Sequence, residues 1–279
     1  MSFDPRLMRV GIEIGKEIIW VEGLMLEASI TKVANATSND ATIKVANMTK
    51  DHRDNILTET SPFNKLGVRK RVIVEAGRES CGLSRIFTGD IINATPSQPP
   101  DISITLTART NNWNKTQVTS KSYAGMISMQ RIAQDIADSM ELSLNFEATD
   151  RQIASYAFTG AKSQQLNKLG EIGRVNAYID DDKLIVKDVG KAAKQSAQTH
   201  VLDLSSGMVG IPELTEQGIR VKMMFEPFSR IGGMLEVKSI INPGANGKYI
   251  IYKMSYDISN RSEQFYTTVE AYKQGRYLQ

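Results

Sequence analysis

The residue types that most often do chemistry are scarce in this sequence. Its histidines and its cysteine are His52, His200 and Cys81, which lie far apart along the chain. A closed zinc site needs four ligands of this kind, so the sequence predicts no zinc centre. Because Cys81 is the only cysteine, the chain cannot form an internal disulfide, and a lone thiol is typical of a protein that matures in a reducing compartment.

Two groups of acidic residues could suggest a cation site or an acid–base pair. The three aspartates at 180–182 lack the alternating Asp, Asn and Gly and the closing Glu of an EF-hand loop. We interpret them as a solvated hairpin turn. Asp135 and Asp138 lie on the polar face of a predicted helix, where such pairs are common, so they do not indicate a glycosidase.

Two partial motifs resemble nucleotide-binding or kinase segments and fail at defined points. His52-Arg-Asp-Asn55 is neither preceded by a Gly-rich loop nor followed by Asp-Phe-Gly, so we expect a polar loop or a helix start there. Gly11-Ile-Glu-Ile-Gly-Lys16 is one residue short between its glycines and lacks the Ser or Thr after the lysine. The sequence also has no Gly-x-Ser-x-Gly elbow. It therefore predicts no enzyme, no catalytic residue, no metal and no cofactor.

Two groups of residues are candidates for contacts with a partner. The basic cluster Lys65, Arg69, Lys70 and Arg71 is either a solvated loop or a contact for an acidic surface or for passing DNA phosphates. Near the end of the chain, Tyr266 and Tyr272 share one face of an alternating run. We expect them to point outward and contact protein, although core packing is an equal alternative for each.

The elements that must position these residues fall into three regions. Residues 1–109 alternate apolar and polar side chains in short runs, as at Met8–Ile14, and predict a first β-barrel. Residues 110–195 contain two helical faces and strand-like pieces, and predict a small α+β domain. Residues 196–279 return to short alternating runs and predict a second β-barrel. The expected fold is mainly β, with two similar barrels flanking an α+β insertion.

The composition and net charge also indicate what kind of protein this is. Of 279 residues, 41% are hydrophobic and 23% charged, which is typical of a globular protein with its own core. The net charge of +3 is weak for a domain that grips DNA. We find no signal peptide pattern at the start and no apolar run long enough to span a membrane, so no membrane span is expected.

The last region carries an ordered series of short motifs. Ser206-Gly207 is followed by a hydrophobic residue, by Gly210 and by Pro212, and leads into a strand; Asn246-Gly-Lys-Tyr249, with Gly247, then reads as a tight turn that opens the closing hairpin. Their order resembles the last tube-forming domain of tailed-bacteriophage baseplate or tail hub proteins, the Mu-like hub and late-control protein D group. Ile86–Ile91 resembles the matching element of that family's first barrel.

The resemblance implies a structural protein. Hubs of this family form trimers in which each subunit gives two similar barrels, so that a pseudo-six-fold ring adapts a six-fold tail tube to a three-fold central spike. The implied partners are two further copies, the tail tube protein, the spike or tail tip protein, other baseplate proteins and the tape measure protein, with DNA only in transit through a channel. The implied location is the virion tail, assembled in the bacterial cytoplasm.

Two other function classes stay open at this point. A carbohydrate- or nucleic-acid-binding β-barrel module would be a monomer with a basic or aromatic groove. A tail-associated cell-wall hydrolase would need a catalytic carboxylate in a cleft, and the sequence has no leftover segment long enough for a fused hydrolase domain. The mass in solution separates the first of these from a trimeric hub.

Overall fold

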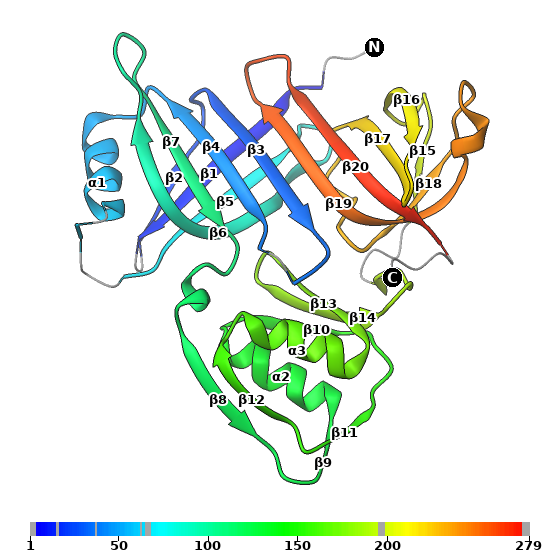
Figure 1. Ribbon diagram of the computed structural model, residues 1–279. Coiled ribbons are helices and arrows are strands. Elements are labelled where there is room, and N and C mark those ends of the chain that lie inside the picture. The colour runs from blue at the N-terminus through cyan, green and yellow to red at the C-terminus, as the bar shows by residue number, and fades with distance from the viewer. Residues whose placement is uncertain are drawn as a thin grey trace.

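The alternating runs at both ends of the sequence form one long, curled sheet (Figure 1). This computed structural model describes residues 4–14, 17–36, 38–61, 63–64, 68–194 and 199–274. The sheet has 13 strands, and eleven of them follow one another in the order β16-β17-β20-β19-β3-β4-β7-β6-β5-β1-β2. The remaining two, β15 and β18, branch from β19, because β18 pairs with both β15 and β19.

The first region supplies seven strands and one helix. Alternation between buried and exposed residues is clear in β4, where Ala41, Ile43 and Val45 are buried and their neighbours are exposed. The elements are β1 (Arg6–Ile14), β2 (Glu17–Val21), β3 (Leu26–Val33), β4 (Asp40–Ala46), α1 (Lys50–Thr60), β5 (Lys70–Arg78), β6 (Gly82–Pro96) and β7 (Ser103–Arg109). Helix α1 contains the His52-Arg-Asp-Asn55 segment, so of the two expected alternatives, a polar loop or a helix start, the structure has the helix.

The last region supplies the other six strands of the sheet. They are β15 (His200–Leu202), β16 (Met208–Leu214), β17 (Gly218–Met224), β18 (Met234–Val237), β19 (Gly247–Ser259) and β20 (Phe265–Lys273), with a short 3-10 helix, η3 (Pro243–Ala245), before β19. Strand β19 is the centre of this region. Its first residues pair with β18, its later residues pair with β3 of the first region, and β20 pairs along nearly its whole length.

The sequence predicted two closed barrels, and this is corrected. Within the described part of the chain no barrel closes by hydrogen bonding, and β2 and β16 are the two ends of the strand path. The reason is that β3 pairs with β19 in an antiparallel register, in which Glu27 lies opposite Ser259 and Val33 lies opposite Lys253. The two outer regions therefore share one sheet. Each region curls on its own side of this shared pair (Figure 1). The mainly β class is confirmed.

The middle region lies below the sheet in Figure 1 and has its own small core. Ser128 caps α2 by accepting a hydrogen bond from the Arg131 backbone N–H at 3.2 Å, and the predicted apolar face of this helix is buried. Its elements are η1 (Trp113–Lys115), β8 (Val118–Ser122), β9 (Met126–Ser128), α2 (Met129–Ser139), β10 (Ser143–Phe146), β11 (Gln152–Ala154), β12 (Ala157–Ala161), α3 (Gln164–Gly173), β13 (Val175–Asp180) and β14 (Lys183–Asp188).

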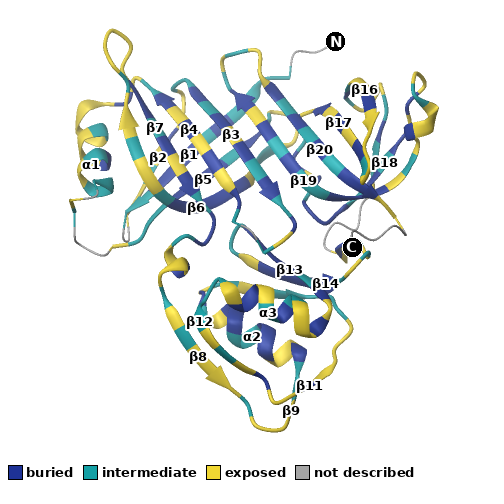
Figure 2. Ribbon diagram, in the orientation of Figure 1, coloured by how far each residue is buried: buried dark blue, intermediate teal, exposed yellow. Residues whose placement is uncertain are grey.

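Burial shows where the regions join. One apolar core runs through both outer regions, and a second fills the middle region (Figure 2). Tyr178 on β13 and Ile185 on β14 belong to the large core although their strands belong to the middle region. The β13–β14 hairpin therefore packs against the sheet. No helix among the described residues has the length and apolarity needed to cross a membrane.

Candidate functional site

The most unusual residue of the sheet is a buried lysine. Leu26, Ala28 and Ile30 of β3 face the core, and strand alternation places Lys32 on the same face, where its side chain is 2% exposed. A charge in such a position needs partners. Its ammonium group donates to Asp180 Oδ1 at 2.6 Å and to Asp181 Oδ1 at 2.8 Å. We call Lys32, Asp180 and Asp181 the central junction.

The electrostatics of the central junction keep its lysine charged. Burial alone would lower the pKa of Lys32, but the attraction of Asp180 and Asp181 outweighs burial and raises it. Burial also raises the pKa of Asp181, assisted by repulsion from Asp180 and opposed by Lys32. Asp181 Oδ1 accepts a further hydrogen bond from the Thr88 backbone N–H at 2.9 Å. The junction therefore connects β3 to the turn between β13 and β14 and, through Thr88, to β6.

Further hydrogen bonds fix the β13–β14 hairpin against both outer regions. On the side of the first region, the Asn39 side chain donates to the Ile179 carbonyl at 3.0 Å, and Asn176 donates to the Ala34 carbonyl at 3.0 Å. On the side of the last region, the Tyr178 hydroxyl donates to the Ile231 carbonyl at 3.2 Å. The hairpin thus holds the two halves of the sheet at a fixed relative position.

The hairpin turn predicted at residues 180–182 is confirmed, because it joins β13 to β14, but the prediction that it is solvated is wrong for Asp180 and Asp181. Asp180 and Asp181 are enclosed by the central junction, and Asp182 pairs with Arg71 and, at 3.3 Å, with Arg85. The turn is polar because it meets cations of the sheet, and the Asp182 side chain is in addition 42% exposed. Among the described residues no group of histidine, cysteine and carboxylate side chains is arranged to hold a metal ion.

The predicted basic cluster lies where the first region meets the middle one. Lys65 lies outside the described residues. Arg69 pairs with Asp90 at 2.7 Å and reaches Glu141 at 3.3 Å, Lys70 donates to the Glu59 carbonyl, and Arg71 pairs with Asp182. Each described member of the cluster therefore has a partner within the chain, and its role toward a partner protein stays a prediction.

The two tyrosines singled out on β20 differ in exposure. Tyr266 is half-buried on the outer face, and the Lys222 ammonium lies 4.3 Å from its ring centroid. Tyr272 is only 8% exposed, because its ring stacks on Tyr252 with centroids 6.3 Å apart. Tyr272 therefore packs in the interior, which is the alternative that the sequence left open. For Tyr266, an outward contact with another protein remains a prediction.

The motif residues of the last region shape its loops. Gly207 and Gly210 both have positive φ, at 107° and 73°, on either side of the start of β16, and Pro212 lies inside that strand. The Tyr249 hydroxyl donates to the Ala245 carbonyl at 2.9 Å. Gly210 and Pro212 thus belong to β16, the last strand at one end of the strand path, and Gly247 and Tyr249 belong to β19.

The tight turn predicted at Asn246-Gly247 is absent, and a longer loop takes its place. Val237 of β18 pairs with Gly247 of β19, so residues 238–246 form the connection. The Asn246 side chain closes this loop by accepting from the Ser239 backbone N–H at 2.6 Å and donating to the Ser239 carbonyl at 3.1 Å. Asn246 is therefore important for loop closure, and not as a turn residue.

The histidines, the cysteine and the acidic helix pair do not assemble. His52 and Cys81 are exposed on separate elements. Asp135 accepts from the Tyr123 hydroxyl and Asp138 from Gln134, both inside the middle region. Asp135 and Asp138 therefore have partners within the middle region.

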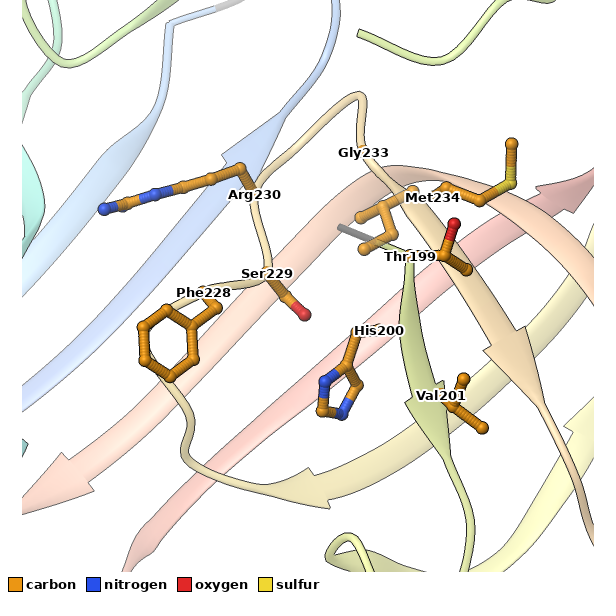
Figure 3. A pocket seen from close by; sticks show the side chains of 9 residues that line it. Thr199, His200, Val201, Phe228, Ser229, Arg230, Gly233 and Met234 are labelled. Carbon is orange, nitrogen blue, oxygen red and sulfur yellow. The ribbon is translucent and has the colours of Figure 1, made fainter. Parts of the chain in front are cut away.

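His200 lines a cavity of about 320 Å³ next to the loop before β18 (Figure 3). The Ser229 side chain points toward the His200 ring, and within the described residues neither Ser229 Oγ nor His200 Nε2 has a hydrogen-bond partner. A serine–histidine pair needs a third group that orients the histidine and donors for an oxyanion. The described lining residues include no carboxylate that could orient His200.

The central junction is the feature that sequence reasoning missed. The available signal was Lys32 itself, a lysine on the apolar face of an alternating strand. Such a residue requires a buried acidic partner, and the acidic run at 180–182 was the strongest candidate in the sequence. Neither position alone indicated the other.

Comparison with known proteins agrees with this architecture. Residues 7–271 match the family model described as baseplate hub gp41. Among curated proteins, no sequence matches this chain.

Solved structures share the fold at low sequence identity. The 43 kDa tail protein of prophage MuSo2 from Shewanella oneidensis is 11% identical, with a TM-score of 0.67 over 95% of this chain and 97% of that one. A tail protein from Neisseria meningitidis MC58 is 9% identical, with a TM-score of 0.67 over 97% and 98%.

A component of the Escherichia coli type VI secretion system, described as similar to the T4 tail proteins gp27 and gp5, is 11% identical. Its TM-score is 0.56 over 100% of this chain and 77% of that one. Because the family model spans nearly the whole sequence, the chain belongs to the baseplate hub gp41 family of tail proteins.

Proposed function

We propose that this chain is the structural hub of a phage baseplate or tail tip, and that three copies form a ring around a channel for DNA. The ring would adapt a six-fold tail tube to a three-fold central spike. The ring would bind the tube on one face and the spike on the other through complementary surfaces, and it would catalyse no reaction.

The observation that carries this proposal is the pairing of β3 with β19. It joins two curled β regions of one chain side by side in a single sheet, and the β13–β14 hairpin fixes them. Three chains with two such regions each supply six β units around one axis. The two outer regions therefore take the role that the sequence assigned to two barrels, and the middle region lies on one side of them (Figure 1).

The proposed partners follow from this position. They are two further copies of the chain, a tail tube protein, a spike or tail tip protein and other baseplate proteins, with the tape measure protein as a further candidate. The family match supports a tail location, and the fold shared with a type VI secretion component supports a place beside a spike. Assembly would occur in the bacterial cytoplasm, before the virion leaves the cell.

Native mass spectrometry of the purified chain tests the ring. We expect trimers, either of the chain alone or in its mixture with the tube and spike proteins. A chain that stays monomeric in both settings contradicts the hub. Turnover assays with peptidoglycan, glycans and nucleotides form the second arm, and an activity lost on changing His200 or Asp135 alone contradicts a purely structural role.

A further inference from the structure

Two buried polar groups on the wall of one cavity have no partner to explain them. Ser229 is only 6% exposed, and neither its hydroxyl oxygen nor His200 Nε2 forms a hydrogen bond to a residue that the structure describes. Both residues line the cavity of Figure 3, where the Ser229 side chain points toward the His200 ring. Because buried polar groups in proteins are almost always hydrogen-bonded, this orphaned pair indicates that a molecule binds in the cavity.

The backbone that presents the orphaned pair is held without its help. After β17, the Glu226 carboxylate accepts from the backbone N–H groups of Phe228 at 2.8 Å and of Ser229 at 2.7 Å. His200 belongs to β15, where it lies opposite Leu235 of β18. A ligand that bonds to the orphaned pair therefore need not order the chain first, which lowers the cost of binding.

The cavity is larger than the orphaned pair alone requires. Its volume is about 320 Å³. About 10–15 Å³ is enough to hold one water molecule, and pockets for small molecules begin at about 300 Å³. The cavity therefore has room for a small organic molecule, and not only for a bridging water.

The charges around the cavity favour a neutral ligand. Apart from His200, the ionisable side chain on the described part of the wall is Arg230, which extends away from His200 in Figure 3 and donates to the Arg85 carbonyl at 2.8 Å. The Glu226 carboxylate is not among the described lining residues, and both of its oxygens already accept from backbone N–H groups. On this part of the wall a cation finds no carboxylate, and an anion finds no guanidinium that points toward it.

The remaining side chains suit the carbon framework of a sugar. Phe228 is 66% exposed and lines the same cavity, and Val201, Met234 and Ile251 add an aliphatic surface. The hydroxyl groups of a sugar both donate and accept, so they can satisfy a serine hydroxyl and either tautomer of an imidazole. Its C–H groups can at the same time pack against the aromatic ring.

We propose that this cavity binds one sugar unit, with the Ser229 hydroxyl and His200 Nε2 as its hydrogen-bonding groups and Phe228 as its packing surface. This binding function is additional to the hub role, and it depends neither on the trimer nor on the channel.

Nuclear magnetic resonance of the imidazole rings tests the site directly, because the chain has two histidines and His52 is exposed on α1. Glucose, galactose and N-acetylglucosamine are titrated separately into the full-length protein at constant pH. We expect at least one sugar to shift the His200 ring signals to saturation while the His52 signals stay unchanged. Inorganic phosphate and acetamide, as a small anion and a small neutral amide, should cause no saturating shift.

Two variants show which groups hold the sugar. Ser229→Ala and Phe228→Ala should each weaken binding roughly tenfold. Phe63→Ala is the matched control, because Phe63 is also an exposed phenylalanine, at 91%, and does not line the cavity. Ser229→Ala should melt at or above the wild-type temperature, because the hydroxyl that it removes has no partner among the described residues.

Three results would overturn the proposal. If none of the three sugars shifts His200 to saturation, the cavity holds ordered water only. A saturating shift with phosphate or acetamide, and none with a sugar, assigns the cavity to an anion or an amide. If Ser229→Ala melts well below the wild type, its hydroxyl serves the fold and not a ligand. Each of these results leaves the hub function intact, because that function is tested by the mass of the assembly.

Discussion

Lys32 and Asp180 meet at 2.6 Å in the interior of the protein although 148 residues separate them in the sequence. The pair joins a strand of the first region to the hairpin of the middle region. A buried ion pair adds little stability relative to an apolar pair of the same shape, but the loss of one partner leaves an uncompensated charge. The central junction therefore makes the position of the hairpin highly specific.

Lys32→Met should lower the free energy of unfolding by about 3–5 kcal/mol, because Asp180 and Asp181 would stay buried without their cation. Urea denaturation measures the loss. The control is Lys44→Met on the neighbouring strand, where the lysine side chain is 49% exposed and lies 3.8 Å from Glu27. Exposed pairs of this kind contribute about 1 kcal/mol or less, so equal losses in the two variants would contradict a special role of the central junction.

Gly232→Ala should destabilise the protein more than any other glycine-to-alanine change at a similar backbone conformation. Its φ is 79°, and an added Cβ would lie 2.0 Å from the Tyr178 hydroxyl oxygen. Gly23→Ala is the matched control, because φ is 74° there and nothing lies within 4 Å of the added atom. The control should cost about 1–2 kcal/mol from backbone strain alone.

We expect Gly232→Ala to exceed its control by a further 2 kcal/mol, roughly the cost of overpacking a core. Thermal melting of both variants provides the comparison. If the two melt together, the hydroxyl of Tyr178 can move away without cost, and the contact between β13 and the last region is looser than its geometry indicates.

Lys187 should make stability rise with pH in the alkaline range. Burial lowers its pKa to about 8, opposed by the attraction of Glu147. The unfolded chain therefore holds this proton more tightly than the folded protein, and unfolding takes up a proton between about pH 8 and 10. From pH 7.5 to 9.5 the contribution of Lys187 to the free energy of unfolding should increase by about 2 kcal/mol.

Lys187→Met removes the group that titrates, so its free energy of unfolding should change less over that range than the wild type's. Urea denaturation at the two pH values gives the difference. Lys191→Met is the control, since its side chain is 70% exposed and pairs with Asp188 at the surface. A wild-type pH slope that persists in Lys187→Met would assign the effect to another group.

Asn246→Ala should loosen the loop at residues 238–246, because it removes both side-chain hydrogen bonds to Ser239. The expected cost is about 1–3 kcal/mol. Asn93→Ala serves as control, since the one hydrogen bond of the Asn93 side chain to a described residue goes to the exposed Thr95 hydroxyl at 3.1 Å. Hydrogen exchange of the loop amides would show faster exchange in Asn246→Ala while the β19–β20 pair stays protected.

The periodicity of apolar residues predicted helices and strands well where one face of the element packs against a core. The helical face from Met129 to Met140 predicted α2, and its side chains are buried as expected. The alternation in β4 and β17 predicted strands because one face of each meets a single apolar core. The family resemblance rested on the order of loop residues, and this order survives even though the turn at Asn246 differs.

Contacts between segments that lie far apart in the sequence could not be predicted from it. Barrel closure failed as a prediction because the partner of β3 is β19, and nothing in the residues from Leu26 to Val33 names that partner. The acidic run at 180–182 looked solvated for the same reason, since its cations come from β3, β5 and β6. Local polarity shows that a residue needs a polar partner, but does not show whether water or another strand provides it.

The pairing of β3 with β19 also sets an order of events during synthesis. Ser29 and Asp257, which hydrogen bond across this pair at 3.0 Å, are 228 residues apart, so the ribosome makes β3 long before its partner. Until then β3 has an open edge, the kind of surface through which nascent chains aggregate. Because such distant contacts close slowly, folding of this chain should be limited by the arrival of β19, and chaperones that shield strand edges should raise its yield.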